Sequence, residues 1–157
     1  KRIKINQYIK TNFVEMKFTD SKVSKKLTPS GNYYSYKKAG AGSKFVYIMG
    51  NIKNLSKTEI YTGSTFVHFC FDNNYEYEGG IVVECHETDM LGGDSTTFDA
   101  NMKALQKSKM YLYAEVPNEV AKKYKTCTVT FGFVKNFESH PIQEKDCDYL
   151  YKITIKR

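Results

Sequence analysis

Residues 45–54, FVYIMGNIKN, constrain the fold more than any other stretch of the sequence. Hydrophobic residues recur at every second position, which is the period of a β-strand with one buried face. The opposite face changes from apolar to polar along the strand, so we expect a central strand whose far end emerges into solvent. A turn at 54–57, NLSK, ends it, because Asn and Ser side chains bond to their own backbone in such turns.

Further segments show the same alternation and predict more strands. They are residues 13–18, 65–72, 109–117, 126–134 and 149–156. Asp72-Asn73-Asn74 predicts a hairpin turn, and residues 118–124 predict one helical turn capped by Asn118. Residues 86–106 are polar and contain glycine, so we expect a long connection there.

This count of elements predicts an all-β fold. We expect an antiparallel immunoglobulin-like β-sandwich of seven to eight strands with one short helical turn, formed by a single domain over residues 1–157. The predicted core comprises Val46, Ile48, Ile52, Val67, Phe69, Phe71, Leu112, Val116, Val129 and Phe131.

Charge is divided into blocks along the chain. Residues 58–102 hold nine acidic and no basic residues, whereas 1–57 hold 13 basic and 2 acidic, and 103–157 hold 11 basic and 6 acidic. In a sandwich, strands from the three blocks are expected to interleave, so that the charges mix and the chain is a monomer. The alternative is that the blocks segregate, which would give the molecule a strong dipole and allow head-to-tail association of acidic with basic faces. No stretch reaches the ~18 apolar residues of a membrane span.

Lysine supplies 22 of the 24 basic residues, and only Arg2 and Arg157 are arginines. Nucleic-acid readers depend on the planar fork of arginine, so nucleic acid is not an expected partner. Lysine-rich charge favours loose attraction to an anionic surface such as a cell wall or a membrane.

An ordered set of segments resembles a known family: Tyr36, GSKFVYIMGNIKN at 42–54, Phe71-Asp72 and LYAEVPNEV at 112–120. The set is similar to immunoglobulin-like domains of unknown function in secreted lipoproteins of Gram-positive bacteria, which are distantly similar to the mycobacterial immunoprotective extracellular protein. Asn54 matches a corner where a strand ends, and Val116-Pro117 matches the stop of a later strand. The resemblance covers about residues 8–137. It implies a sandwich exported to the cell surface, extracellular or surface-anchored, with no catalytic residues to transfer.

Loop residues supply the candidates for ligand binding. Tyr33, Tyr34 and Tyr36, beside Lys37 and Lys38, form either a short edge strand or an aromatic binding platform. Glu87, Asp89 and Asp94 offer oxygen ligands for calcium in a glycine-bearing loop, but without the regular spacing of a calcium loop, so a solvated acidic loop is the alternative.

Cysteine and histidine offer weaker candidates. A zinc site would need His68, Cys70, Cys85 and His86, but neighbouring strand residues point to opposite faces. Cys70 with His68 could form a thiol hydrolase pair. The four cysteines, which include Cys127 and Cys147, allow three disulfide connectivities or free thiols. A hairpin turning near residue 142 places Cys127 and Cys147 out of register, so no bond between these two is expected.

These observations favour a non-enzymatic binding or scaffolding domain at a bacterial surface, without a cofactor or metal, whose partner is a cell-wall component or a surface protein. A small hydrolase or metal-dependent enzyme using residues 68–94, and a purely structural interdomain spacer, are the alternatives.

Overall fold

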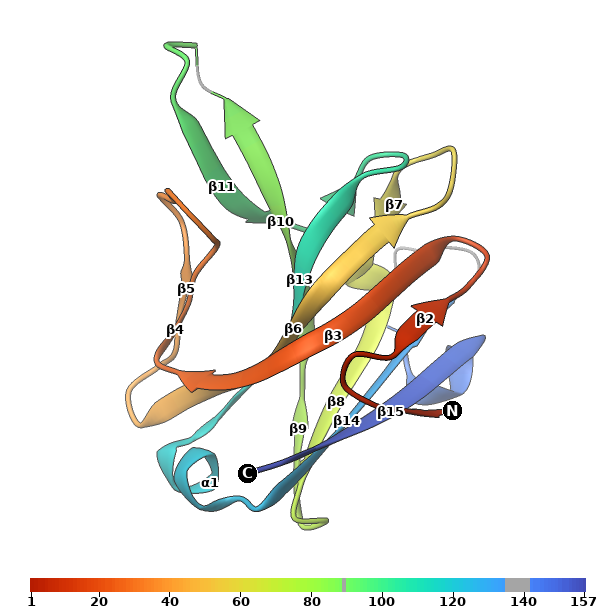
Figure 1. Ribbon diagram of the computed structural model, residues 1–157. Helices are drawn as coiled ribbons and strands as arrows, with labels where there is room; N and C mark the ends of the chain where they lie inside the picture. Colours follow the sequence, from red (N-terminus) through yellow and green to blue (C-terminus); the bar gives the residue numbers. More distant parts are fainter. Residues whose placement is uncertain (89, 135–141) are drawn as a thin grey trace.

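Two β-sheets packed face to face form the body of the protein (Figure 1). The computed structural model describes residues 1–88, 90–134 and 142–157. The five-stranded sheet has the order β1 (Arg2–Ile3), β15 (Tyr149–Lys156), β14 (Thr126–Phe133), β8 (Thr65–Phe71) and β9 (Tyr75–Glu78). All its pairs are antiparallel except β1 with β15, which run parallel.

The six-stranded sheet is antiparallel throughout. Its order is β11 (Asp94–Asp99), β10 (Gly80–Thr88), β13 (Lys107–Pro117), β6 (Ser43–Asn54), β3 (Val14–Ser24) and β2 (Tyr8–Lys10). Two ribbons join β12 (Asn101–Met102) to β7 (Ile60–Tyr61) and β4 (Lys26–Leu27) to β5 (Lys37–Lys38). The helical elements are α1 (Asn118–Lys123) and the short 3-10 turns η1 (Thr62–Ser64) and η2 (Glu144–Asp146). The predicted antiparallel β-sandwich is therefore confirmed.

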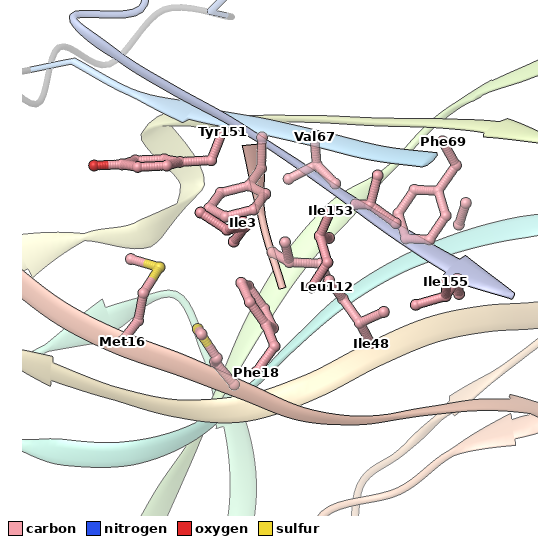
Figure 2. Close-up of a cluster of buried hydrophobic side chains, with 14 of the residues drawn as sticks. Ile3, Met16, Phe18, Ile48, Val67, Phe69, Leu112, Tyr151, Ile153 and Ile155 are labelled. Carbon is pink, nitrogen blue, oxygen red and sulfur yellow. The ribbon is translucent and has the colours of Figure 1, made fainter. Parts of the chain in front are cut away.

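The core lies between the sheets and contains all ten residues predicted for it. Figure 2 shows Ile48 and Leu112 of the six-stranded sheet facing Val67, Phe69 and the isoleucines of β15. Aromatic rings interlock across the gap, with Phe18 of β3 edge-on to Phe131 of β14 at 5.2 Å between ring centroids. Alternation along each strand thus identified the inward faces correctly.

β6 is a central strand, as its sequence predicts, and its end is fixed by Asn54. The Asn54 side chain is fully buried and uses both ends of its amide. Its nitrogen donates to the carbonyls of Thr58, Met102 and Lys103, while its oxygen accepts from the backbone and hydroxyl of Ser56. The turn after β6 is therefore tied to the loop that precedes β13.

Three expectations about elements are wrong. Residues 86–106 are not a long connection, because β10 continues to Thr88 and returns as β11. Asn118 does not cap α1: Pro117 occupies the N-cap position, no side chain caps it, and the Asn118 Oδ1 atom is buried without a hydrogen-bond partner. The strands exceed seven or eight, because short segments near the N-terminus and the β10–β11 hairpin add to the sheets.

Within the two sheets the charge blocks are separated, contrary to expectation. The acidic block supplies β8 and β9 at one end of the five-stranded sheet, and β10 and β11 at the matching end of the six-stranded sheet. β8 and β10 contact each other across the core, so the acidic strands form one side of the sandwich. The basic N-terminal strands β1, β2 and β3 lie at the opposite ends. The two sheets therefore have an acidic end and a basic end, although the loop between the basic β4 and β5 is joined to the acidic end by the Asn32–Thr96 and Tyr34–Glu87 hydrogen bonds.

Gly79 and Gly80 explain how the acidic strands occupy both sheets. β9 ends at Glu78 and β10 begins at Gly80, so one extended segment passes from the first sheet to the second. A Cβ atom on Gly79 would lie 2.7 Å from Val67 and 2.8 Å from the Tyr113 carbonyl oxygen. The crossing therefore needs a residue without a side chain.

The four cysteines are free thiols. Cys127 lies opposite Ile155 in the pairing of β14 with β15, which leaves Cys147 outside the paired strands. This register supports the prediction that Cys127 and Cys147 are not linked, although the expected pairing of residue 137 lies outside the described residues. Among the described residues, no helix is long and apolar enough to cross a membrane.

Candidate functional site

The outer face of the six-stranded sheet, which points away from the core, carries polar side chains on its central strands. Residues on this face alternate with the buried set, so neighbouring strands place their side chains in rows. One row contains Lys17, Asn51 and Lys109, and the next contains Glu15, Lys53 and Lys107. Side chains directly opposite one another in such rows lie about 4.5–5.5 Å apart at their Cβ atoms.

Two adjoining hollows of about 570 and 380 Å³ cross this face and share residues 107–109 of β13. The larger extends from β13 to β10 and β11, and the smaller extends from β13 to β2. Together they form what we call the lysine trough. Its cationic side chains are Lys17, Lys53, Lys103, Lys107 and Lys109, and its carboxylates are Glu15 and Glu84.

The trough lysines form no ion pairs among the described residues. Within the described part of the chain, none of the five has a carboxylate oxygen within ion-pair distance. Lys17 places its ammonium group 4.8 Å from the centre of the Tyr8 ring, and Lys109 donates to the Ser30 hydroxyl at 2.7 Å. The trough therefore carries five lysines against the two carboxylates of Glu15 and Glu84, and no ion pair joins them in the described part of the chain.

Glu84 forms one wall of the trough and is fully engaged. Its Oε1 atom accepts hydrogen bonds from the Ser30 backbone at 2.8 Å, the Ser30 hydroxyl at 2.7 Å and the Tyr111 hydroxyl at 2.5 Å. Burial and the bond to Glu84 raise the pKa of Tyr111 far above its usual value, so the phenol remains a donor. This network fixes the loop after β4 against the sheet.

That loop covers a second, smaller core on the outer face. Leu27, Ala39, Phe45, Tyr47, Val82 and Tyr111 are buried beneath it. The same loop donates no strand to the sheet, but the carbonyl of Asn32 accepts a hydrogen bond from the Thr96 backbone of β11. The outer face thus has two parts. One is covered by the loop and packs as a small core, and the other is the lysine trough, which is open and charged.

The predicted tyrosine platform divides into two parts. Tyr33 and Tyr36 form an exposed edge-to-face pair with centroids 6.2 Å apart. Tyr34 instead donates to the Glu87 carboxylate, and this bond raises the pKa of the Tyr34 phenol. Of the two lysines, Lys37 lies over the Tyr113 ring at 5.2 Å, while Lys38 is exposed. A ligand role for these five residues stays a prediction.

The metal candidates are not gathered into a cluster in the described chain. Glu87 is bonded to Tyr34, Asp94 accepts from Thr88 at 2.9 Å, and Asp89 lies outside the described residues. The four residues considered for zinc are also separated: His68 faces Glu76 at 3.8 Å on one sheet, whereas His86 faces Asp94 at 3.5 Å on the other.

The environments of Cys85, Cys127 and Cys147 disfavour the reactive thiolate anion. Burial raises the pKa of Cys127 far above the usual range and that of Cys147 to about 11. Burial also raises the pKa of Cys85, helped by Asp99 and Glu87. A nucleophilic cysteine needs the opposite shift.

Sequence reasoning missed the lysine trough, although its signal is present. Lys107 and Lys109, Asn51 and Lys53, and Glu15 and Lys17 are spaced by two, which places each pair on one face of its strand. The sequence does not reveal that β3, β6 and β13 pair side by side, because these strands are far apart in the chain.

Comparisons with known proteins support the fold. No family model and no curated protein sequence matches the chain. An uncharacterized β-sandwich protein from Clostridium difficile 630 is similar in structure, with a TM-score of 0.71 and 20% identity over 99% of this chain and 94% of that one. The yjhA protein of Bacillus subtilis gives a TM-score of 0.50 and 12% identity, covering 96% and 98%. The ycdA protein of the same species, provisionally described as a lipoprotein, gives 0.44 and 13%, covering 95% and 38%.

Proposed function

We propose that this β-sandwich is a non-enzymatic binding domain that holds an anionic polymer in the lysine trough. The observation that carries the proposal is the set of five trough lysines without an acidic partner in the described chain. Keeping like charges together on one face costs free energy, and an anionic ligand would offset that cost.

The shape of the trough favours an extended ligand. It runs across the sheet from β2 to β11, and adjacent strands lie ~4.8 Å apart, so its length is about 24 Å. Lys17, Lys53 and Lys107 come from three successive strands. Positive groups repeated across strands suit a chain with phosphate or carboxylate groups along its length, rather than one compact anion.

A site outside the cell is part of this proposal. It is supported by the resemblance of the Asn54 corner and the Val116-Pro117 stop to secreted domains. Surface digestion with protease on the cells that make the protein tests it: an extracellular domain is cut while the cells are intact, and a protein that is cut only after lysis contradicts the location.

The enzymatic alternative finds less support in the region assigned to it. Of the two cysteines in residues 68–94, Cys85 has a raised pKa, which disfavours a nucleophile near neutral pH. In the candidate pair of Cys70 and His68, the His68 imidazole lies 3.8 Å from the Glu76 carboxylate, and among the described residues no hydrogen bond joins it to Cys70. We therefore assign the trough a binding role.

The test uses linear polyphosphate as the probe and removes two trough charges. Lys53→Gln with Lys107→Gln should weaken binding measured by calorimetry at low salt, because two phosphate contacts are lost. The slope of log affinity against log salt should become shallower by about 1.4, at ~0.7 per phosphate contact on a single-stranded polyanion.

A matched control removes the same net charge elsewhere. Lys122 on α1 and Lys156 at the end of β15 are exposed and lie outside the trough. Lys122→Gln with Lys156→Gln should leave the affinity within about twofold of the parent. Equal loss in both double variants would mean that polyphosphate recognises overall charge, and the trough would lose its assignment.

A further inference from the structure

We infer that the β10–β11 arm, described over residues 84–88 and 90–99, docks into the lysine trough of a second copy of this chain. The arm extends beyond the body of the sandwich (Figure 1, top left). β10 pairs with β13 only as far as Val83, so the later residues of β10 pair with β11 alone. The loop after β4 holds the base of this ribbon, since the Asn32 carbonyl accepts from the Thr96 backbone and Tyr34 donates to Glu87, but the described residues of its tip are exposed.

The chemistry of the arm suits a basic partner with some apolar surface. Residues 80–102 contain five acidic and no basic residues. Near its tip the Met90 side chain is completely exposed, with a relative accessibility of 102%. A large apolar side chain among acidic ones favours a surface that is positive and partly apolar, and disfavours an anionic membrane.

The trough offers that combination. Its lysines lie beside Tyr8, which is 67% exposed, and Leu105, which is 63% exposed. Leu105 adopts φ of 61°, a left-handed conformation that is rare for leucine and that holds this residue at the rim of the larger hollow. The arm's acidic and apolar groups thus have counterparts of opposite charge and matching polarity on the same protein.

The arm of one molecule cannot fill its own trough. Glu84 and His86, at the base of the arm, form the trough wall, and the strand then continues outward to Thr88. Four further residues beyond Glu84 carry the backbone about 13 Å away. Contact between arm and trough therefore requires a second copy.

The second copy would bind in the lysine trough, which is also the site of the proposed function. The inference rests on that proposal because both require the trough to accept acidic groups. It predicts that polymer and second copy exclude each other, because both occupy the same lysines. Sedimentation velocity should show association at 0.01 M salt that is lost at 0.15 M, as the Debye length falls from ~30 to ~8 Å. Added polyphosphate should return the 0.01 M sample to monomer.

Two variants make the test specific. An arm variant, Met90→Ser with Asp94→Asn, and a trough variant, Lys53→Glu with Lys107→Glu, should each be monomeric at 0.01 M salt. Mixing them should restore association, since the intact trough of the first can receive the intact arm of the second. The unfolding midpoint of each variant, measured in urea, shows that it is folded.

The result that would overturn the arm-to-trough contact differs from the result that would overturn polymer binding by the trough. A monomeric parent at both ionic strengths, or no association in the mixture, overturns the arm-to-trough contact. The arm variant should still bind polyphosphate like the parent, so loss of self-association with retained polymer binding supports both proposals. Association that survives in the arm variant would point to another acidic surface and would also overturn the inference.

Discussion

Gly50 illustrates how one residue permits the central strand pairing. It lies on the inner face of β6 opposite Phe18, where β3 carries a bulge between Phe18 and Asp20. A Cβ atom at this position would lie 2.1 Å from the Lys17 carbonyl oxygen, a distance that no rotamer can relieve because the obstacle is backbone. The bulge returns the following residues of β3 to the correct faces, so Gly50 supports the register on both sides.

Gly50→Ala should therefore lower the free energy of unfolding by about 3 kcal/mol, at the upper end for inserting a methyl group into a packed site. Urea unfolding followed by circular dichroism measures the loss. Gly40→Ala is the matched control, since its Cβ would meet only the Glu115 carboxylate at 3.2 Å. Its effect should remain within about 0.5 kcal/mol. Similar values for the two variants would show that β3 can move away from β6.

At the scale of elements, Asp72 connects the β8–β9 turn to β14. Its carboxylate accepts hydrogen bonds from the backbone of Thr126 at 2.8 Å and of Lys125 at 3.0 Å. These bonds, that from Thr126 above all, lower the pKa of Asp72. Asp72 also adopts φ of 50°, a conformation that aspartate and asparagine tolerate better than most residues.

Asp72→Asn should make the protein less dependent on pH on the acid side. A carboxyl whose pKa is lowered in the folded state stabilises it above the unfolded pKa of about 3.9, and this contribution disappears as the pH falls through the folded value. The parent should be more stable than the variant at pH 6, and the two should converge as the pH falls through the lowered pKa of Asp72. Thermal unfolding from pH 6 to pH 2 measures both. A constant difference would show that the charge of Asp72 is irrelevant.

The elements that could be predicted from sequence are those with one buried face. Strands such as β13 and β14 alternate apolar and polar residues, so their inward positions follow from a period of two. The outer part of the β10–β11 arm has no buried face, since its described residues 86–88 and 90–94 are all exposed, and its sequence therefore resembles that of a loop. The trough was also beyond prediction, since it depends on which strands become neighbours.

At the scale of the whole molecule, the charge is separated although the net value is ordinary. The sequence has a net charge of +7, but residues 58–102, with nine acidic and no basic residues, supply the strands at one end of each sheet. The sheet orders explain this separation: consecutive strands stay at the same end of each sheet instead of alternating across it. The molecule therefore has a large dipole in addition to its net charge.

This dipole predicts behaviour that the isoelectric point of about 9.1 does not. At pH 8 and ~0.01 M salt, where surface charges are poorly screened, the protein should bind a cation exchanger and also an anion exchanger. Glu76→Gln with Glu78→Gln on the edge strand β9 should reduce retention on the anion exchanger. Glu144→Gln with Asp146→Asn, outside the acidic block, should change it less. Flow-through of the parent on the anion exchanger would contradict a coherent acidic edge.

The crossing at Gly79–Gly80 also affects how the molecule comes apart. Because one backbone segment is hydrogen-bonded in both layers, the layers cannot be pulled apart without releasing that segment from one of them. A tensile load on the arm would pass along the covalent chain from β10 into β9, rather than across hydrogen bonds between strands. The crossing thus links the two sheets covalently, so that a force on the protruding arm is shared by both sheets.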